Sequence, residues 1–105
     1  MELPNLTYIN ELSGNDDSFK EKIIAIIKNE LPEEIKNYQN AIKNNDYVVT
    51  AGIVHKLKHK ISIFGLEKSY YIAKEFEDNL KSESTDLQPE FEEILNKMQN
   101  FLYNL

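Results

Sequence analysis

Apolar residues recur every three to four positions along almost the whole chain, and few residues interrupt this spacing. The 105 residues include only three glycines and three prolines, and no long run alternates apolar with polar residues as an amphipathic strand does. Helical spacing places the apolar side chains on one face of each helix, so several helices must bury these faces against one another. The pattern predicts an all-α fold, an antiparallel up-down four-helix bundle with a short additional N-terminal helix.

Turn and capping residues divide the pattern into segments. The expected helices cover residues 5–12, a long segment after residues 15–18, residues 46–64, residues 67–81, and a last helix with Pro89 in its first turn. Pro32 lies inside the long segment, where it removes an amide donor and clashes with the preceding turn. We therefore expect Pro32 to kink this helix or to start a new one. Gly65 stands at a helix–helix corner, which requires a residue that tolerates positive φ.

Composition narrows the function classes. A net charge of −6 and the lack of arginine argue against nucleic-acid binding, which needs a basic surface. Without cysteine, disulfides and cysteine-based zinc sites are excluded. No run of 18 apolar residues and no signal-peptide pattern occur, so we expect a cytoplasmic protein without membrane association. The length fits a single domain, residues 1–105.

Positive charge gathers around the two histidines of this acidic chain. Five basic residues, both histidines among them, lie close together: His55, Lys56, Lys58, His59 and Lys60. On a helix, His55, Lys58 and His59 share one face because they are three and four residues apart. Ser62 lies one turn further along that face. A histidine on the solvent side of a helix, surrounded by ammonium groups, is well placed to carry an anion such as a phosphoryl group.

The residues after His55 resemble the signature of histidine-containing phosphotransfer (HPt) domains. The matching positions are His55, Leu57, Lys58 and Gly65, followed downstream by Ala73, Phe76 and Glu77. The resemblance implies a four-helix bundle that carries a phosphoryl group on His55. It further implies that Lys58 stabilises charge and that Glu77 is the polar residue on the neighbouring helix. The chain departs from the family pattern at His59 and Lys60, where the family usually has glycine and serine.

The resemblance therefore predicts a phosphohistidine carrier in a two-component multistep phosphorelay, relaying the group between aspartates of receiver domains. We expect a monomer without kinase activity of its own, because no Gly-rich phosphate loop or kinase motif occurs. It needs no cofactor, and Mg²⁺ is expected on the partner receiver domain. Docking of the receiver is assigned to a basic and polar set: Lys56, His59, Lys60, Ser62 and Lys68. The alternative is an unphosphorylated HPt-like helical module that binds receiver or kinase domains.

Two further interpretations concern single side chains. His55 and His59 are spaced to hold two coordination positions of Zn²⁺. Their intervening residues lack the glutamate of a zinc-protease helix, and the flanking ammonium groups repel a dication, so no metal ligand is assigned and a helical metal-binding protein stays a third alternative. Glu77 follows Ala73 by four residues, about 40° around a helix, and thus lies at the edge of an apolar stripe. A carboxylate there needs a partner, for which Lys58 and His55 are the candidates.

Overall fold

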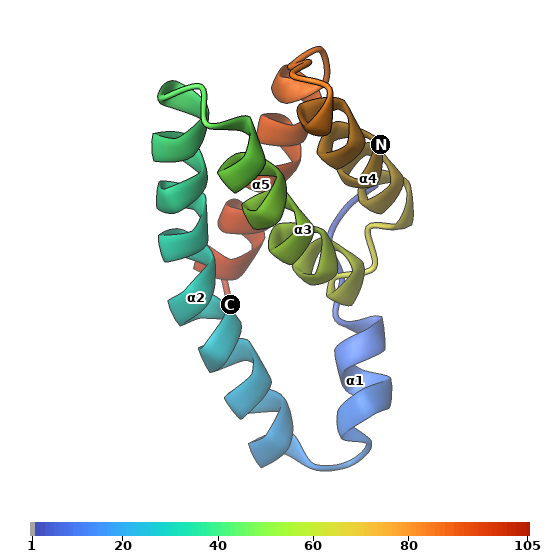
Figure 1. Cartoon of the computed structure of the whole chain (residues 1–105). Helices are drawn as coiled ribbons and strands as arrows, with labels where there is room; N and C mark the ends of the chain where they lie inside the picture. Colours follow the sequence, from blue (N-terminus) through green and yellow to red (C-terminus); the bar gives the residue numbers. More distant parts are fainter. Residues whose placement is uncertain (1) are drawn as a thin grey trace.

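The computed structural model describes residues 2–105, which form five α-helices and no strand (Figure 1). The helices are α1 (Thr7–Ser13), α2 (Asp17–Lys43), α3 (Tyr47–Ile63), α4 (Glu67–Lys81) and α5 (Gln88–Tyr103). The predicted all-α class is confirmed, and the expected helix 67–81 agrees at both ends. None of the helices within residues 2–105 combines the length and the apolar character needed to cross a membrane.

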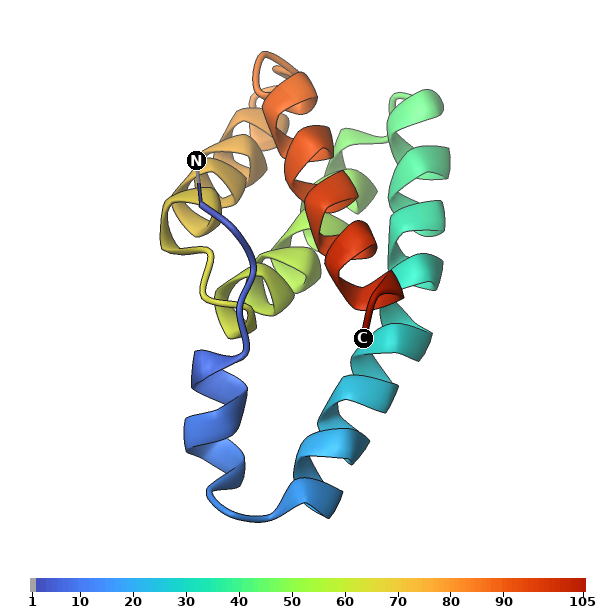
Figure 2. The same cartoon turned by 180° about the vertical axis from the view of Figure 1, so that it is seen from behind.

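The longest helix, α2, runs without interruption through Pro32. Of the two expected outcomes at Pro32, a kink or the start of a new helix, the structure therefore shows the first. The axis of α2 bends, since its light-blue lower half and its green upper half run in different directions in both views (Figures 1 and 2). A proline removes a single hydrogen bond, and the core contacts of Leu31 and Ile35 on either side hold the helix together across that position.

Three aromatic rings join α2, α4 and α5 in the core, toward the end of the molecule where α2 and α4 finish and α5 begins. The ring centroid of Phe91 lies 5.3 Å from that of Tyr38 and 5.1 Å from that of Phe76. Tilted pairs of this kind contribute about 0.5–1.5 kcal/mol each beyond area burial. The central helix α3 packs against both α2 and α4. Its fully buried apolar residues are Val54, Leu57 and Ile61. This apolar face fixes the rotation of α3 about its axis.

Capping residues set where α2 and α3 begin. The carboxylate of Asp16 accepts a hydrogen bond from the Phe19 amide at 3.0 Å, and that of Asp46 accepts one from the Val49 amide at 3.2 Å. Each such cap satisfies an amide that has no partner in its own helix, worth about 1 kcal/mol. The Asp46 cap defines the start of the helix that carries both histidines.

The N-terminal segment crosses the corner between α3 and α4 (Figure 2). The Asn5 amide donates a hydrogen bond to the Phe64 carbonyl oxygen at 2.9 Å, and the Glu2 carboxylate accepts from the amides of Lys68 and Ser69, both at 2.8 Å. Burial alone raises the pKa of Glu2, but hydrogen bonds from Lys68 and Ser69, together with the charge of Lys68, outweigh it and lower the pKa. Glu2 thus caps α4, although it lies far from that helix in the sequence.

Gly65 is expected to tolerate no side chain. Its φ is +74°, and a Cβ atom there would lie 2.6 Å from Nδ2 of Asn5. We expect Gly65→Ala to lower the free energy of unfolding by about 1–2 kcal/mol, the cost of a left-handed conformation for an L-residue. Gly52→Ala is the matched control, since open space surrounds that helical position. It should stabilise the protein by about 0.5–1 kcal/mol. Urea unfolding measures the free energy of unfolding of both variants. A Gly65→Ala variant as stable as wild type would contradict the argument.

Candidate functional site

Helices α3 and α4 bring His55 and Glu77 into contact. The Nδ1 atom of His55 lies 3.2 Å from Oε1 and 3.1 Å from Oε2 of Glu77. An ionised carboxylate only accepts hydrogen bonds, so a neutral imidazole in this contact carries its proton on Nδ1. The lone pair is then on Nε2. Because 53 % of the His55 side chain is exposed, a partner can approach the ring from solvent.

Glu77 is buried and has a second strong partner. The ammonium of Lys58 lies 3.0 Å from its Oε1 atom, and the ammonium of Lys81 lies 3.6 Å from Oε2. Burial alone raises the pKa of Glu77, but hydrogen bonding and charge from Lys58, with His55, outweigh it and hold the pKa below its ordinary value of 4.5. Glu77 is therefore a carboxylate at neutral pH. The predicted partnership with Lys58 and His55 is confirmed for both.

Lys58 does not lie on the exposed face that helical spacing predicted for it. Only 7 % of the residue is exposed, and its ammonium also lies 5.7 Å from the centre of the Tyr70 ring. The long lysine side chain turns into the α3–α4 contact because the buried carboxylate there requires a cation. The prediction of a shared exposed face is wrong for Lys58, whereas His55, His59 and Ser62 are exposed.

His59 places a second imidazole beside the first. Its Nε2 atom lies 3.4 Å from Nε2 of His55, and the two rings meet nearly edge to face, with planes at 87°. The position where the signature usually has glycine is thus filled by a ring that reaches the free nitrogen of His55.

A hollow opens on the other side of His55, toward the start of α3. It is lined by Val48, Ala51, Gly52, His55, Lys56, Glu77 and Lys81. Gly52, three residues before His55, has no atom near the place of a Cβ, and Val48 is 84 % exposed. Sequence reasoning missed Gly52. A glycine in the middle of a helix costs about 1 kcal/mol of helix stability relative to alanine. Its presence inside a predicted helix was therefore the sequence signal for a special position.

The other predicted docking residues do not all gather here. Lys56 lines the hollow. Lys60 points toward α2, where its ammonium lies 2.9 Å from Glu34 and 3.3 Å from Glu30. Lys68 lies in the first turn of α4, away from Glu77 near the end of that helix. The structure therefore brings together His55, His59, Lys58 and Glu77, with Lys56 beside them.

Comparison with known families agrees with this geometry. The family model described as "Hpt domain" matches residues 22–104, a range that contains His55, Lys58 and Glu77. The chain belongs to the Hpt domain family. Hpt domains are phosphotransfer modules of phosphorelay signalling and interact with receiver domains. No curated protein and no solved structure matches the chain.

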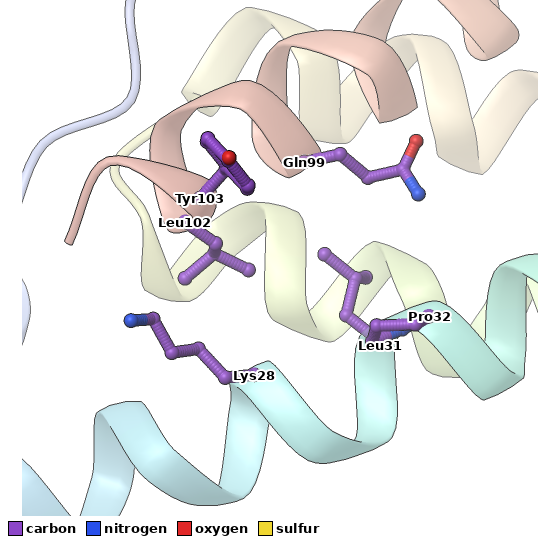
Figure 3. Close-up of a pocket in the computed structure, with 6 residues that line it drawn as sticks. All are labelled: Lys28, Leu31, Pro32, Gln99, Leu102 and Tyr103. Carbon is purple, nitrogen blue, oxygen red and sulfur yellow. The ribbon is translucent and has the colours of Figure 1, made fainter.

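A second hollow in this Hpt domain lies between α2 and α5 (Figure 3). Its lining residues are Lys28, Leu31, Pro32, Gln99, Leu102 and Tyr103. It offers no histidine or carboxylate, so it lacks the groups that a phosphoryl acceptor site needs. Among residues 2–105, no group of three or more histidine, cysteine, aspartate or glutamate side chains is arranged to hold a metal ion.

The ion pair of Glu77 predicts a specific dependence of stability on pH. Glu77→Gln leaves the buried ammonium of Lys58 without its counter-charge, which we expect to cost about 2–4 kcal/mol at pH 7. A carboxyl group whose pKa is lowered by folding stabilises the protein above its unfolded pKa, and this contribution is lost as the pH falls through the folded value. The difference in the free energy of unfolding between wild type and Glu77→Gln should therefore narrow as the pH falls below 4.5.

Urea unfolding between pH 3 and pH 7 measures this difference. The matched control is the double variant Lys58→Met/Glu77→Gln, which removes both charges and should recover part of the lost stability. A free energy of unfolding for Glu77→Gln within about 0.5 kcal/mol of the wild-type value at pH 7 would contradict the assigned role of Glu77.

Proposed function

We propose that Nε2 of His55 accepts a phosphoryl group and relays it between aspartates of receiver domains. The observation that carries this proposal is the contact between Nδ1 of His55 and the buried carboxylate of Glu77. It leaves the lone pair on Nε2 of an exposed ring, in a chain that belongs to the Hpt domain family. A phosphohistidine carrier is the function that this arrangement supports best.

The transfer follows from this tautomer. The Nε2 lone pair forms a bond to phosphorus while the oxygen–phosphorus bond of the receiver's aspartyl phosphate breaks, and the aspartate leaves as a carboxylate. The imidazole gains positive charge as this bond forms, and Glu77 offsets that charge through the proton on Nδ1. The reverse step delivers the group to a second receiver. Because such transition states are loose, alignment and charge balance are the main tasks of this chain, and Mg²⁺ belongs to the receiver.

Lys58 has a positioning role in this proposal. Its ammonium is buried against Glu77, so it holds the carboxylate in place and balances its charge rather than contacting the transferring oxygens. Lys56, His59 and Ser62 remain the proposed docking residues on α3, with Val48 and Gly52 added from the hollow. Lys60 is paired with carboxylates of α2, and Lys68 lies in the first turn of α4, so neither joins this cluster and their docking role stays a prediction.

The proposal includes a finer description of the protein. We infer that α2, α3, α4 and α5 form an antiparallel up-down four-helix bundle and that residues 1–105 are one domain. It acts in the cytoplasm as a monomer that binds receivers transiently. The packing of α3 against α2 and α4, with α5 against the same two helices, supports this arrangement.

Phosphotransfer from a phosphorylated receiver domain or a small phosphoramidate tests the acceptor. Wild type and His59→Gln should take up an acid-labile, base-stable label, and His55→Gln should take up none. Label lost in His59→Gln but kept in His55→Gln would move the acceptor to His59. Absence of label on wild type from several donors would favour the alternative, an unphosphorylated module that binds receiver or kinase domains. The contact of His59 with the acceptor nitrogen is the observation that favours this alternative.

The orienting role of Glu77 is tested by two substitutions. We expect Glu77→Ala to slow labelling of His55 roughly 10–100-fold, the size of effect seen when a metal-binding histidine loses its carboxylate partner. Glu77→Gln keeps an oxygen that accepts from Nδ1 and should retain more of the rate. Nitrogen NMR of the ring reports the tautomer directly. Equal rates for wild type and Glu77→Ala would contradict the role.

A further inference from the structure

We propose that the Nε2 atoms of His55 and His59 form a chelating site for a divalent transition-metal ion of the Zn²⁺ class. The two atoms lie 3.4 Å apart, one helical turn from each other on α3. Two nitrogens bound to a tetrahedral zinc ion at 2.0–2.1 Å lie about 3.3–3.4 Å apart. The same separation is long for a hydrogen bond donated by an N–H group, which is usually about 2.7–3.2 Å. The spacing therefore fits two ligands of one ion better than a shared proton.

Glu77 supports this arrangement through its contact with the other ring nitrogen of His55, Nδ1. Metal-binding histidines commonly donate their other ring N–H to a carboxylate, which fixes the tautomer and raises the basicity of the ligand nitrogen. Nδ1 of His55 has this contact with Glu77 at 3.1 Å, so its Nε2 lone pair is available without rearrangement. His59 is exposed, and its ring can adjust to the ion.

Repulsion of a metal ion by the neighbouring lysine ammonium groups is weaker in the structure than their number in the sequence suggests. The ammonium of Lys58 is paired with Glu77, and that of Lys60 is paired with Glu34 and Glu30. Lys56 and Lys81 remain on the same side of the molecule and limit the affinity. With two protein ligands and water in the other positions, we expect a Kd of roughly 1–100 μM for Zn²⁺.

The site has a consequence for phosphotransfer, which rests on the proposed function of His55. Nε2 of a neutral His55 has one lone pair. A bound ion occupies that lone pair, and a phosphorylated Nε2 has none left to coordinate an ion. Metal binding and phosphorylation therefore exclude each other, and His59 makes this chain susceptible to an ion that a glycine there would not retain.

Calorimetric titration of the full chain with ZnCl₂ tests the site without reference to phosphorylation. We expect one ion per chain for wild type, at least tenfold weaker binding in His55→Gln and in His59→Gln, and a smaller loss in Glu77→Gln. Co²⁺ provides a second probe, since its visible spectrum reports tetrahedral nitrogen coordination. Circular dichroism checks that each variant is folded. Uptake unchanged in both histidine variants, or no uptake below about 1 mM Zn²⁺, would overturn the site.

Labelling by a small phosphoramidate, with no receiver present, tests the competition. Zn²⁺ at a saturating concentration should slow labelling of wild type at least tenfold and leave labelling of His59→Gln nearly unchanged. Equal labelling of wild type with and without Zn²⁺ would overturn the competition. Failure of wild type to be labelled even without Zn²⁺ would instead refute the phosphocarrier proposal, while the calorimetric result would still decide whether the metal site exists.

Discussion

A buried carboxylate must be paired, and the arrangement of α3 against α4 depends on this requirement at Glu77. Its oxygens are contacted by Lys58 and His55 from α3 and by Lys81 from its own helix. Transfer of an unpaired charge from water to this position would be strongly unfavourable, so the two helices pack in the register that brings these groups together. The same contact places the proton of His55 on Nδ1 and the lone pair on the exposed side.

Other parts of the molecule keep that register. The Asp46 side chain fixes the first turn of α3, and Gly65 allows the sharp corner before α4. Glu2 then caps α4 from the N-terminal segment. These polar contacts act at the helix ends, whereas the rings of Tyr38, Phe76 and Phe91 pack in the apolar core. Precise placement of one imidazole thus depends on helix ends as much as on the core.

Access to His55 differs on its two sides. Toward the C-terminus of α3, the ring of His59 fills the space next to Nε2. Toward the N-terminus, Gly52 leaves open space that exposed Val48 and Lys56 border. The surface beside His55 is therefore apolar and basic on one side and carries a second imidazole on the other. This asymmetry follows from Gly52 and His59, which lie three residues before and four residues after His55 on the same helix.

The sequence by itself determined the helices and their turns, because these depend on local spacing and capping, and it singled out His55 as the proposed acceptor. Gly65 was predicted at its corner for that reason. Lys58 and His55 were named as candidate partners of Glu77 because a carboxylate beside an apolar stripe needs one, and the structure shows both contacts. Only the tertiary structure decided that Lys58 turns inward, that Lys60 turns to α2, and that α2 continues through Pro32. A lysine side chain is long and flexible, so its direction is set by carboxylates on neighbouring helices, which local spacing does not reveal.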